Sequence, residues 1–140
     1  MKVAVVYWSG TGHTEAMAQA VAEGARRAGA EAVLLTPSEF DVSLLDTVDA
    51  VAFGCPAMGA EELEESEFAP MFASCESRLA GRRLALFGSY GWGSGEWMQS
   101  WEETCVGDGA VLACDSVICC EEPDDEALEA CRALGAALCA

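Results

Sequence analysis

The chain has very little of what metal binding and acid–base catalysis require. Its 140 residues include a single histidine, His13, and its eight cysteines form no Cys-x-x-Cys pair. Because Cys/His metal sites draw their ligands from such pairs, the sequence predicts no metal centre. It also contains no nucleophile–base pair and no carboxylate dyad that a motif would bring into a cleft. These absences favour a protein that holds a ligand over an enzyme that cleaves bonds.

Positive charge is scarce as well. Seven Lys and Arg residues stand against 24 Asp and Glu residues, which gives a net charge of −17. Such a surface repels nucleic acid and anionic membranes, so neither is an expected partner. It favours encounters with basic patches on other proteins. Solubility alone is the alternative explanation for the charge.

Long hydrophobic runs are also missing. No segment is long enough to span a membrane, and the apolar run after Lys2 is too short for the core of a signal peptide. We therefore expect a cytoplasmic protein whose cysteines are mostly small buried hydrophobic residues in a reducing environment. The adjacent pair Cys119 and Cys120 is the exception. The length predicts one domain over residues 1–140, and we expect a monomer.

What the sequence does contain is an alternation of short apolar runs and longer segments with helical spacing. The apolar runs predict strands at Val3–Tyr7, Ala32–Leu35, Ala50–Gly54, Arg83–Gly88 and Val111–Ile118. The longer segments predict helices at Met17–Ala28, Glu62–Leu79, Glu96–Cys105 and Leu128–Leu138. Gly29 is the expected stop of the first helix, and the connection from Thr36 to Thr47 has room only for a weak helix or a single turn.

This order of elements predicts the fold class. Strands that alternate with helices favour an α/β fold, a doubly wound parallel sheet with helices on both faces and right-handed crossovers. In such sheets, ligands bind beyond the carboxyl ends of the strands, near the switch in strand order. The loops that follow the strands are therefore the candidate site.

The loop after the first predicted strand has the composition of a phosphate-binding turn. Backbone N–H groups at a helix start and three hydroxyls come together in the run Ser9, Gly10, Thr11, Gly12, His13 and Thr14. A Walker A loop needs Lys where His13 stands, and the dinucleotide fingerprint needs a small residue where Glu15 stands. The turn therefore favours a ligand with one phosphate group held by neutral donors. An ordinary polar turn between strand and helix is the alternative.

Two more loops follow the third and fourth predicted strands, at Cys55–Glu61 and Ser89–Gly95. Trp92 lies among glycines that have no bulk to bury it, so a flat ligand is its expected partner; packing on its own loop is the alternative. Met58 is a weaker candidate because methionine fills gaps anywhere. Trp97 and Trp101, one helical turn apart, are expected to be packing residues. Acidic clusters beside these loops would resist the addition of negative charge to a redox ligand, which predicts a low reduction potential.

Four stretches of the sequence resemble the short-chain flavodoxins of anaerobic bacteria. They are Tyr7–Gly12, Gly54–Gly59, Glu61–Glu64 and Leu86–Met98, and their order and spacing agree along the whole chain. The resemblance implies a flavodoxin-like, five-stranded parallel sheet in the order 2-1-3-4-5. It also implies FMN as cofactor, transfer of single electrons in place of ferredoxin, and partners among ferredoxin-dependent oxidoreductases with basic patches.

The resemblance further implies a role for each loop. Ser9–Thr14 would hold the FMN phosphate, while Met58 and Trp92 would cover the two faces of the flavin. Glu61 would bond the N3 side of the ring, and the Gly59–Ala60 peptide would rotate on reduction to accept a hydrogen bond from N5. The implied cofactor-binding residues are Ser9, Gly10, Thr11, Gly12, His13, Thr14, Pro56, Ala57, Met58, Gly59, Ala60, Glu61, Ser89, Tyr90, Gly91, Trp92 and Gly93.

The sequence departs from this family at two places, and two other classes share the fold. His13 stands where the family usually has Asn, and Cys119–Cys120 replaces other residue types. A small FMN-dependent quinone reductase is the alternative, although those chains are longer and carry an insertion that 140 residues leave no room for. A response-regulator receiver would need an acidic pair at the end of the first strand, where this chain has Tyr7, Trp8 and Ser9. We therefore expect a low-potential electron carrier and not an enzyme.

Overall fold

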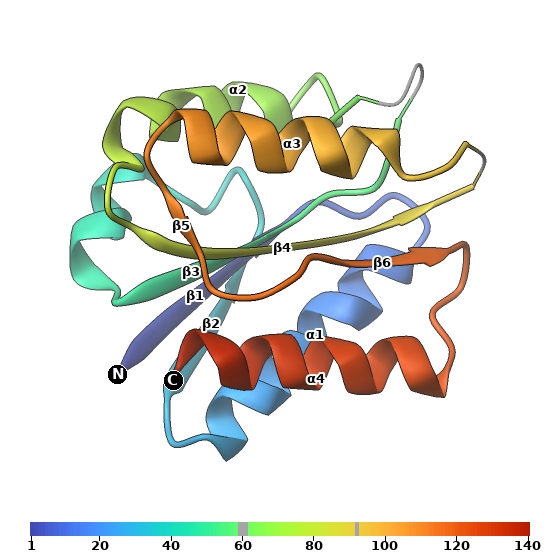
Figure 1. Ribbon diagram of the computed structural model, residues 1–140, viewed down its shortest axis with the longest axis horizontal. Helices are drawn as coiled ribbons and strands as arrows, with labels where there is room; N and C mark the ends of the chain where they lie inside the picture. Colours follow the sequence, from blue (N-terminus) through green and yellow to red (C-terminus); the bar gives the residue numbers. More distant parts are fainter. Residues whose placement is uncertain (59–61, 92) are drawn as a thin grey trace.

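The computed structural model describes residues 1–58, 62–91 and 93–140. Its centre is a parallel sheet with the strand order β2-β1-β3-β4-β5, and β6 pairs with β4 beyond β5 (Figure 1). The strands are β1 Lys2–Tyr7, β2 Glu31–Leu35, β3 Ala50–Gly54, β4 Arg83–Tyr90, β5 Val111–Leu112 and β6 Val117–Cys120. The predicted doubly wound sheet and its order are confirmed.

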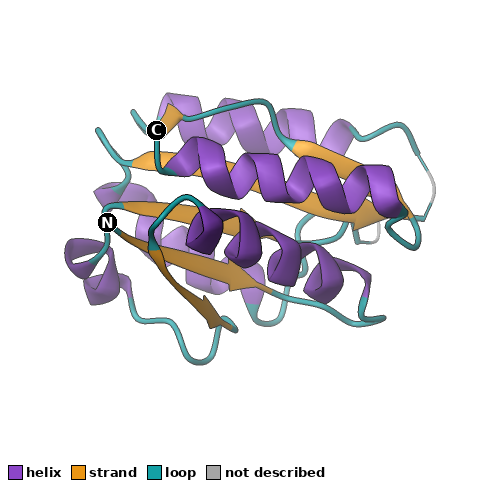
Figure 2. Ribbon diagram, turned by 90° about the horizontal axis from the view of Figure 1, so that it is seen from below, coloured by secondary structure: helices purple, strands orange, loops and turns teal. Residues whose placement is uncertain are grey.

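Helices cover both faces of the sheet. One face carries α1 and α4, which lie in front of the strands in Figure 2, and the other carries α2 and α3. The bounds are α1 His13–Arg27, α2 Phe68–Cys75, α3 Glu96–Gly107 and α4 Asp125–Leu138, with short 3-10 helices η1 Val42–Thr47 and η2 Glu76–Arg78. Gly29, at φ 97°, follows the end of α1 as predicted. Among the described residues, no helix is long and apolar enough to cross a membrane.

Small residues bring α1 and α4 into backbone contact. A Cβ atom on Gly24 of α1 would lie 1.9 Å from the carbonyl oxygen of Arg132, and one on Gly135 of α4 would lie 2.0 Å from that of Val21. Neither helix can move toward or past the other without a clash. This contact fixes α1 over the sheet and so fixes its first turn at the carboxyl ends of the strands.

Aromatic rings fill the opposite layer, under α2 and α3. The ring of Phe53 on β3 meets Phe40, Phe68 and Phe72 edge-on, with centroids 6.4, 6.4 and 5.3 Å away. Trp101 of α3 adds edge contacts to Phe68 and Phe72 at 5.4 and 5.7 Å and is only 3% exposed. Trp101 is a packing residue, as predicted.

The helix predicted over Glu62–Leu79 was wrong at its beginning. Helix α2 begins at Phe68, which places Pro70 in its first turn, where the missing N–H of proline breaks no hydrogen bond. A helix from Glu62 would put Pro70 in its interior. The Glu64 carboxylate also accepts hydrogen bonds from the N–H groups of Phe68 and the residue before it, at 2.9 and 2.7 Å.

The strand predicted over Val111–Ile118 is interrupted. Leu112 pairs with Leu84 and Val117 pairs with Phe87, so the six residues 112–117 span the same length as the four residues 84–87 of β4. The extra residues leave the ladder as a bulge between β5 and β6. There the hydroxyl of Ser116 donates to the carboxylate of Glu102 on α3 at 2.6 Å.

Strand β4 also runs past its predicted end at Gly88. Ser89 and Tyr90 pair with Cys119 and Cys120 of β6, so they belong to the strand and not to the loop that follows it. The partner strand makes the difference, because backbone groups at the end of β4 gain a ladder that the local sequence does not reveal.

Candidate functional site

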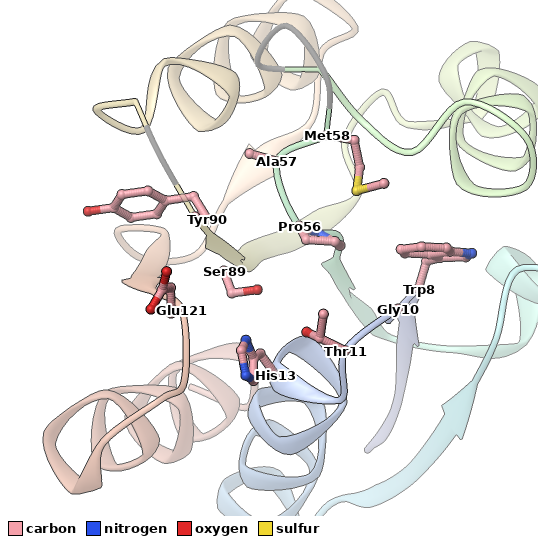
Figure 3. A pocket seen from close by; sticks show the side chains of 11 residues that line it. Trp8, Gly10, Thr11, His13, Pro56, Ala57, Met58, Ser89, Tyr90 and Glu121 are labelled. Carbon is pink, nitrogen blue, oxygen red and sulfur yellow. The ribbon is translucent and has the colours of Figure 1, made fainter.

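The candidate site is a pocket of about 340 Å³ at the carboxyl ends of β1, β3 and β4 (Figure 3). This is the position that a doubly wound sheet favours for ligand binding. The lining residues are Trp8, Gly10, Thr11, His13, Pro56, Ala57, Met58, Ser89, Tyr90, Gly91 and Glu121. All of them except Trp8 and Glu121 belong to the site predicted from the sequence. A second hollow of about 320 Å³ adjoins it at Trp8 and Gly10 and includes Ser9 and Gly12.

The glycine-rich turn, residues 9–14, is open toward this pocket. Gly12 adopts a left-handed conformation at φ 94° and precedes α1, and its N–H donates to the hydroxyl of Ser9 at 3.1 Å. Within the described residues, no other backbone N–H between Ser9 and Thr14 donates to a protein atom. Unpaired N–H groups at a helix start are what an anionic group needs, so the turn fits a phosphate.

Two hydroxyls behind the turn join it to β4. The side chains of Thr14 and Ser89 are hydrogen-bonded at 3.2 Å, and both residues are at most 5% exposed. Thr14 does not line the pocket, so its hydroxyl supports the turn from inside. His13, in contrast, lines the pocket and lies beside Thr11 and Ser89 in Figure 3.

Trp8 is a site residue that the sequence analysis did not assign. Its ring lies directly over the turn, because a Cβ atom on Gly10 would come within 3.0 Å of it. Met58, which is 39% exposed, extends toward the same side of the pocket (Figure 3). Alternation along β1 could have found Trp8, since Ala4 and Val6, on the same face, belong to the cluster against which Trp8 packs.

The loop after β3 is anchored to β4 before it reaches Met58. The N–H of Cys55 donates to Phe87 at 3.2 Å, and the N–H of Ala57 donates to Ser89 at 3.0 Å. Met58 and Glu62 then exchange two backbone hydrogen bonds, of 2.8 and 2.9 Å. The predicted site residues Gly59, Ala60 and Glu61 between them lie outside the described residues.

The far wall of the pocket comes from the ends of β4 and β6. Tyr90 packs on the buried ring of Trp97 at 5.6 Å, and the indole N–H of Trp97 donates to the carbonyl of Cys55 at 3.3 Å. Glu121 adopts a left-handed conformation at φ 59° while its N–H donates to Tyr90 at 2.7 Å. Strained backbone of this kind gathers at functional sites, and no local sequence signal predicts it.

The loop after β4 is only partly described. Gly91 lines the pocket, whereas Gly93 is exposed at φ 87° and does not line it. Trp92, predicted to cover one face of a flat ligand, lies outside the described residues.

Charge is distributed unevenly between the two ends of the sheet. The amino ends of the strands, with the last turn of α1, carry six of the seven cationic residues, Lys2, Arg26, Arg27, Arg78, Arg82 and Arg83. Arg132 lies on α4 and is paired with Glu23 and Glu129 at 3.1 and 2.9 Å. Among the described residues, none that lines the pocket is Lys or Arg. The donors that the described lining offers to an anionic group are therefore backbone N–H groups, hydroxyls and the imidazole of His13.

Two cysteines near the site are held as thiols by burial. Burial raises the pKa of Cys55 to about 12 and that of Cys119 to about 11, so both stay as neutral thiols at pH 7. Cys119 faces α1, with its sulfur 3.6 Å from that of Met17, whereas Cys120 is exposed. Of all eight, four are buried, three are half-buried and Cys120 is exposed, so the expected burial holds for half of them.

Comparisons with known proteins agree over nearly the whole chain. A family model described as flavodoxin matches residues 5–135. The flavodoxin of Megasphaera elsdenii is 42% identical over 135 residues, which cover 96% of each chain. The flavodoxin of Clostridium beijerinckii is 43% identical, with 86% of this chain and 88% of that one covered. The solution structure of two-electron reduced Megasphaera elsdenii flavodoxin superposes with a TM-score of 0.89, at 44% identity and 99% coverage of both chains.

Proposed function

The chain belongs to the flavodoxin family, and on that premise we propose that it replaces ferredoxin as a low-potential carrier of single electrons on non-covalently bound FMN. It is an electron-transfer protein rather than an enzyme, as the names of its relatives indicate. The observation that carries the proposal is the turn of unpaired N–H groups beside a pocket of about 340 Å³.

Each part of the pocket has a role in this proposal. The unpaired N–H groups of Gly10, Thr11, His13 and Thr14 and the hydroxyls of Ser9 and Thr11 would hold the phosphate, while the N–H of Gly12 holds the Ser9 hydroxyl in place. His13 lies within the same lining. Pro56, Ala57, Met58 and the strand end Ser89–Gly91 would enclose the ring. Trp92, Gly59, Ala60 and Glu61 keep the roles implied by the family resemblance as predictions, as does Gly93.

The bound FMN supplies reversible one-electron chemistry, and the protein sets its conditions. Apolar side chains such as Met58, Ala57 and Trp8 exclude water from the pocket. The lower dielectric constant there strengthens the electrostatic interaction between a bound ligand and every nearby charge. Glu121 lines the pocket, and no cation among the described lining residues balances it. Adding an electron there is disfavoured, so a low reduction potential follows.

A partner with a basic patch fits the layout of charge. Cations gather at the amino ends of the strands, so such a partner is attracted more strongly to the pocket end than to the other. Electron transfer to a basic redox protein should slow about tenfold or more between 0.02 and 0.5 M salt, measured by stopped-flow absorbance. Electron-transfer rates that do not change with salt concentration would mean that the acidic surface serves solubility alone.

The cysteines agree with the expected location. All eight are unpaired, which fits a monomer in the reducing cytoplasm.

Affinity for FMN and for riboflavin distinguishes a phosphate turn from an ordinary one. Titration calorimetry of the apoprotein should show riboflavin binding weaker by several kcal/mol, because each charge-assisted hydrogen bond contributes about 1.5–3 kcal/mol. Thr11→Val should weaken FMN binding and leave riboflavin unchanged. Equal affinities for both ligands would contradict the proposal. Rapid turnover with quinones would instead favour the alternative, a small FMN-dependent reductase.

A further inference from the structure

Glu64 is an ionised side chain in the protein interior, beside the pocket loop. It is 5% exposed, whereas its neighbours Glu62 and Glu65 are exposed. It lies between the loop that carries Met58 and the start of α2. A buried carboxylate must be compensated by hydrogen bonds. The donors that compensate Glu64 all belong to the next four residues of the chain.

The two carboxylate oxygens of Glu64 collect donors from the next turn of chain. One accepts from the N–H and the hydroxyl of Ser66, the former at 3.0 Å, and the other accepts from the N–H groups of Glu67 and Phe68 at 2.7 and 2.9 Å. Although burial raises the pKa of Glu64, these hydrogen bonds outweigh it and lower the pKa to about 2. The group is therefore a fixed anion at the start of α2.

The N–H of Glu64 joins this residue to the chain just after β3, while its carbonyl makes a further bond to α2. Its N–H donates to the sulfur of Cys55 at 3.3 Å, and its carbonyl accepts from the N–H of Ala69 at 2.8 Å. Between these residues, Met58 and Glu62 are joined by their two backbone hydrogen bonds. The segment from Cys55 to Glu64 is thus closed twice, once at its base and once just below Met58.

We propose that Glu64 is a positioning residue for Met58. Its carboxylate fixes the chain at residue 64 to the start of α2, and its N–H fixes the same point to the chain just after β3. The two hydrogen bonds between Met58 and Glu62 then hold Met58, in the wall of the pocket, against this fixed point. The consequence for cofactor binding rests on the proposed function. The fixed position of Met58 does not, because it is a property of the apoprotein.

Amide exchange in the apoprotein tests the proposal without any cofactor. In Glu64→Gln the amide nitrogen meets backbone donors, so exchange at Met58 and Glu62 should be about tenfold faster than in the wild type. Glu65→Gln is the matched control, since it removes the same charge from an exposed neighbour and should change these rates less than about twofold. Glu64→Asp, which keeps the charge on a shorter side chain, should lie between the two.

The second readout is affinity for FMN, which should fall about tenfold in Glu64→Gln and hardly change in Glu65→Gln. If Glu64 only capped α2, exchange would accelerate at Glu67 and Phe68 while Met58 and Glu62 kept their wild-type rates, and that result would overturn the proposal. Asp124→Ala, which removes the cap of α4 at 2.8 Å from Ala127, controls for general loss of stability. If the wild type binds no FMN but amide exchange at Met58 is still faster in Glu64→Gln than in the wild type, the proposed function is refuted and the positioning role stands.

Discussion

The two helical layers of this protein pack against the sheet with different kinds of side chain, small residues under α1 and α4 and aromatic rings under α2 and α3. Under α1 and α4, alanines and glycines let backbones touch, and that layer fixes the glycine-rich turn. Under α2 and α3, aromatic rings meet edge-on, and that layer supports Met58 and the loop after β4. Backbones in contact leave no room for an added methyl group, whereas side chains can repack around a smaller ring. In this sense the rigid layer lies beside the proposed phosphate site and the adaptable layer beside the proposed ring site, where hydrogen bonds of Glu64 and not the rings hold Met58.

The largest expected effect comes from adding one methyl group to the rigid layer. Gly24→Ala should lower the free energy of unfolding by about 4 kcal/mol, because the new Cβ would meet the backbone carbonyl of Arg132 at 1.9 Å. Gly107→Ala on α3, where nothing lies within 4 Å, should instead stabilise by about 0.5 kcal/mol. Urea denaturation of the apoproteins measures both. Equal small effects would mean that α1 and α4 can separate freely.

Lowering the pH should destabilise the protein at the start of α2, because the Glu64 carboxylate that accepts hydrogen bonds there becomes protonated. The pKa of Glu64 in the folded state, about 2, lies below its ordinary value of 4.5, so its contribution is complete above pH 4.5 and is lost as pH falls toward 2. The shift corresponds to at most about 3 kcal/mol. Denaturation at several pH values should show the wild type more stable than Glu64→Gln at pH 6 and nearly equal to it at pH 2. If the difference in free energy of unfolding between the wild type and Glu64→Gln does not change with pH, Glu64 is not a buried anion in the folded state.

A smaller loss than either of these is expected when a ring in the adaptable layer is replaced. Phe72→Leu removes edge contacts to Phe53 and Trp101 at 5.3 and 5.7 Å and should lower the free energy of unfolding by about 1.5 kcal/mol. Leu134→Met on α4, a swap that conserves volume, should cost less than about 1 kcal/mol. Thermal unfolding of the apoproteins can rank the two. A loss for Phe72→Leu as large as that for Gly24→Ala would erase the contrast between the layers.

Local signals were enough for most of the fold. The stop at Gly29, the alternation of strands and helices, and the short connection after Thr36 are properties of neighbouring residues. Of the differences described above, the end of β4 and the interruption between β5 and β6 depend on strand partners, whereas the start of α2 could have been predicted from Pro70. Helix α2 begins where Pro70 and the Glu64 carboxylate allow, and β4 continues to Tyr90 because β6 lies beside it.

The site divides in the same way. The turn at residues 9–14 and Met58 were predicted because their residue types indicate what they can bind, helped by the family resemblance. Trp8 was missed although its position in the β1 alternation pointed to the pocket. Glu121 could not have been predicted, since its left-handed conformation follows from the end of the β4–β6 ladder.

The gathering of cations at the amino ends of the strands leaves the pocket end the more negative of the two, so the molecule has an electric dipole directed along the sheet. In the field of a positively charged surface, a torque turns the acidic pocket end toward that surface before contact. An electrode coated with amines would therefore collect the protein already oriented, with the cluster of arginines pointing away. Orientation during approach, and not only attraction, thus follows from where seven cations lie among 140 residues.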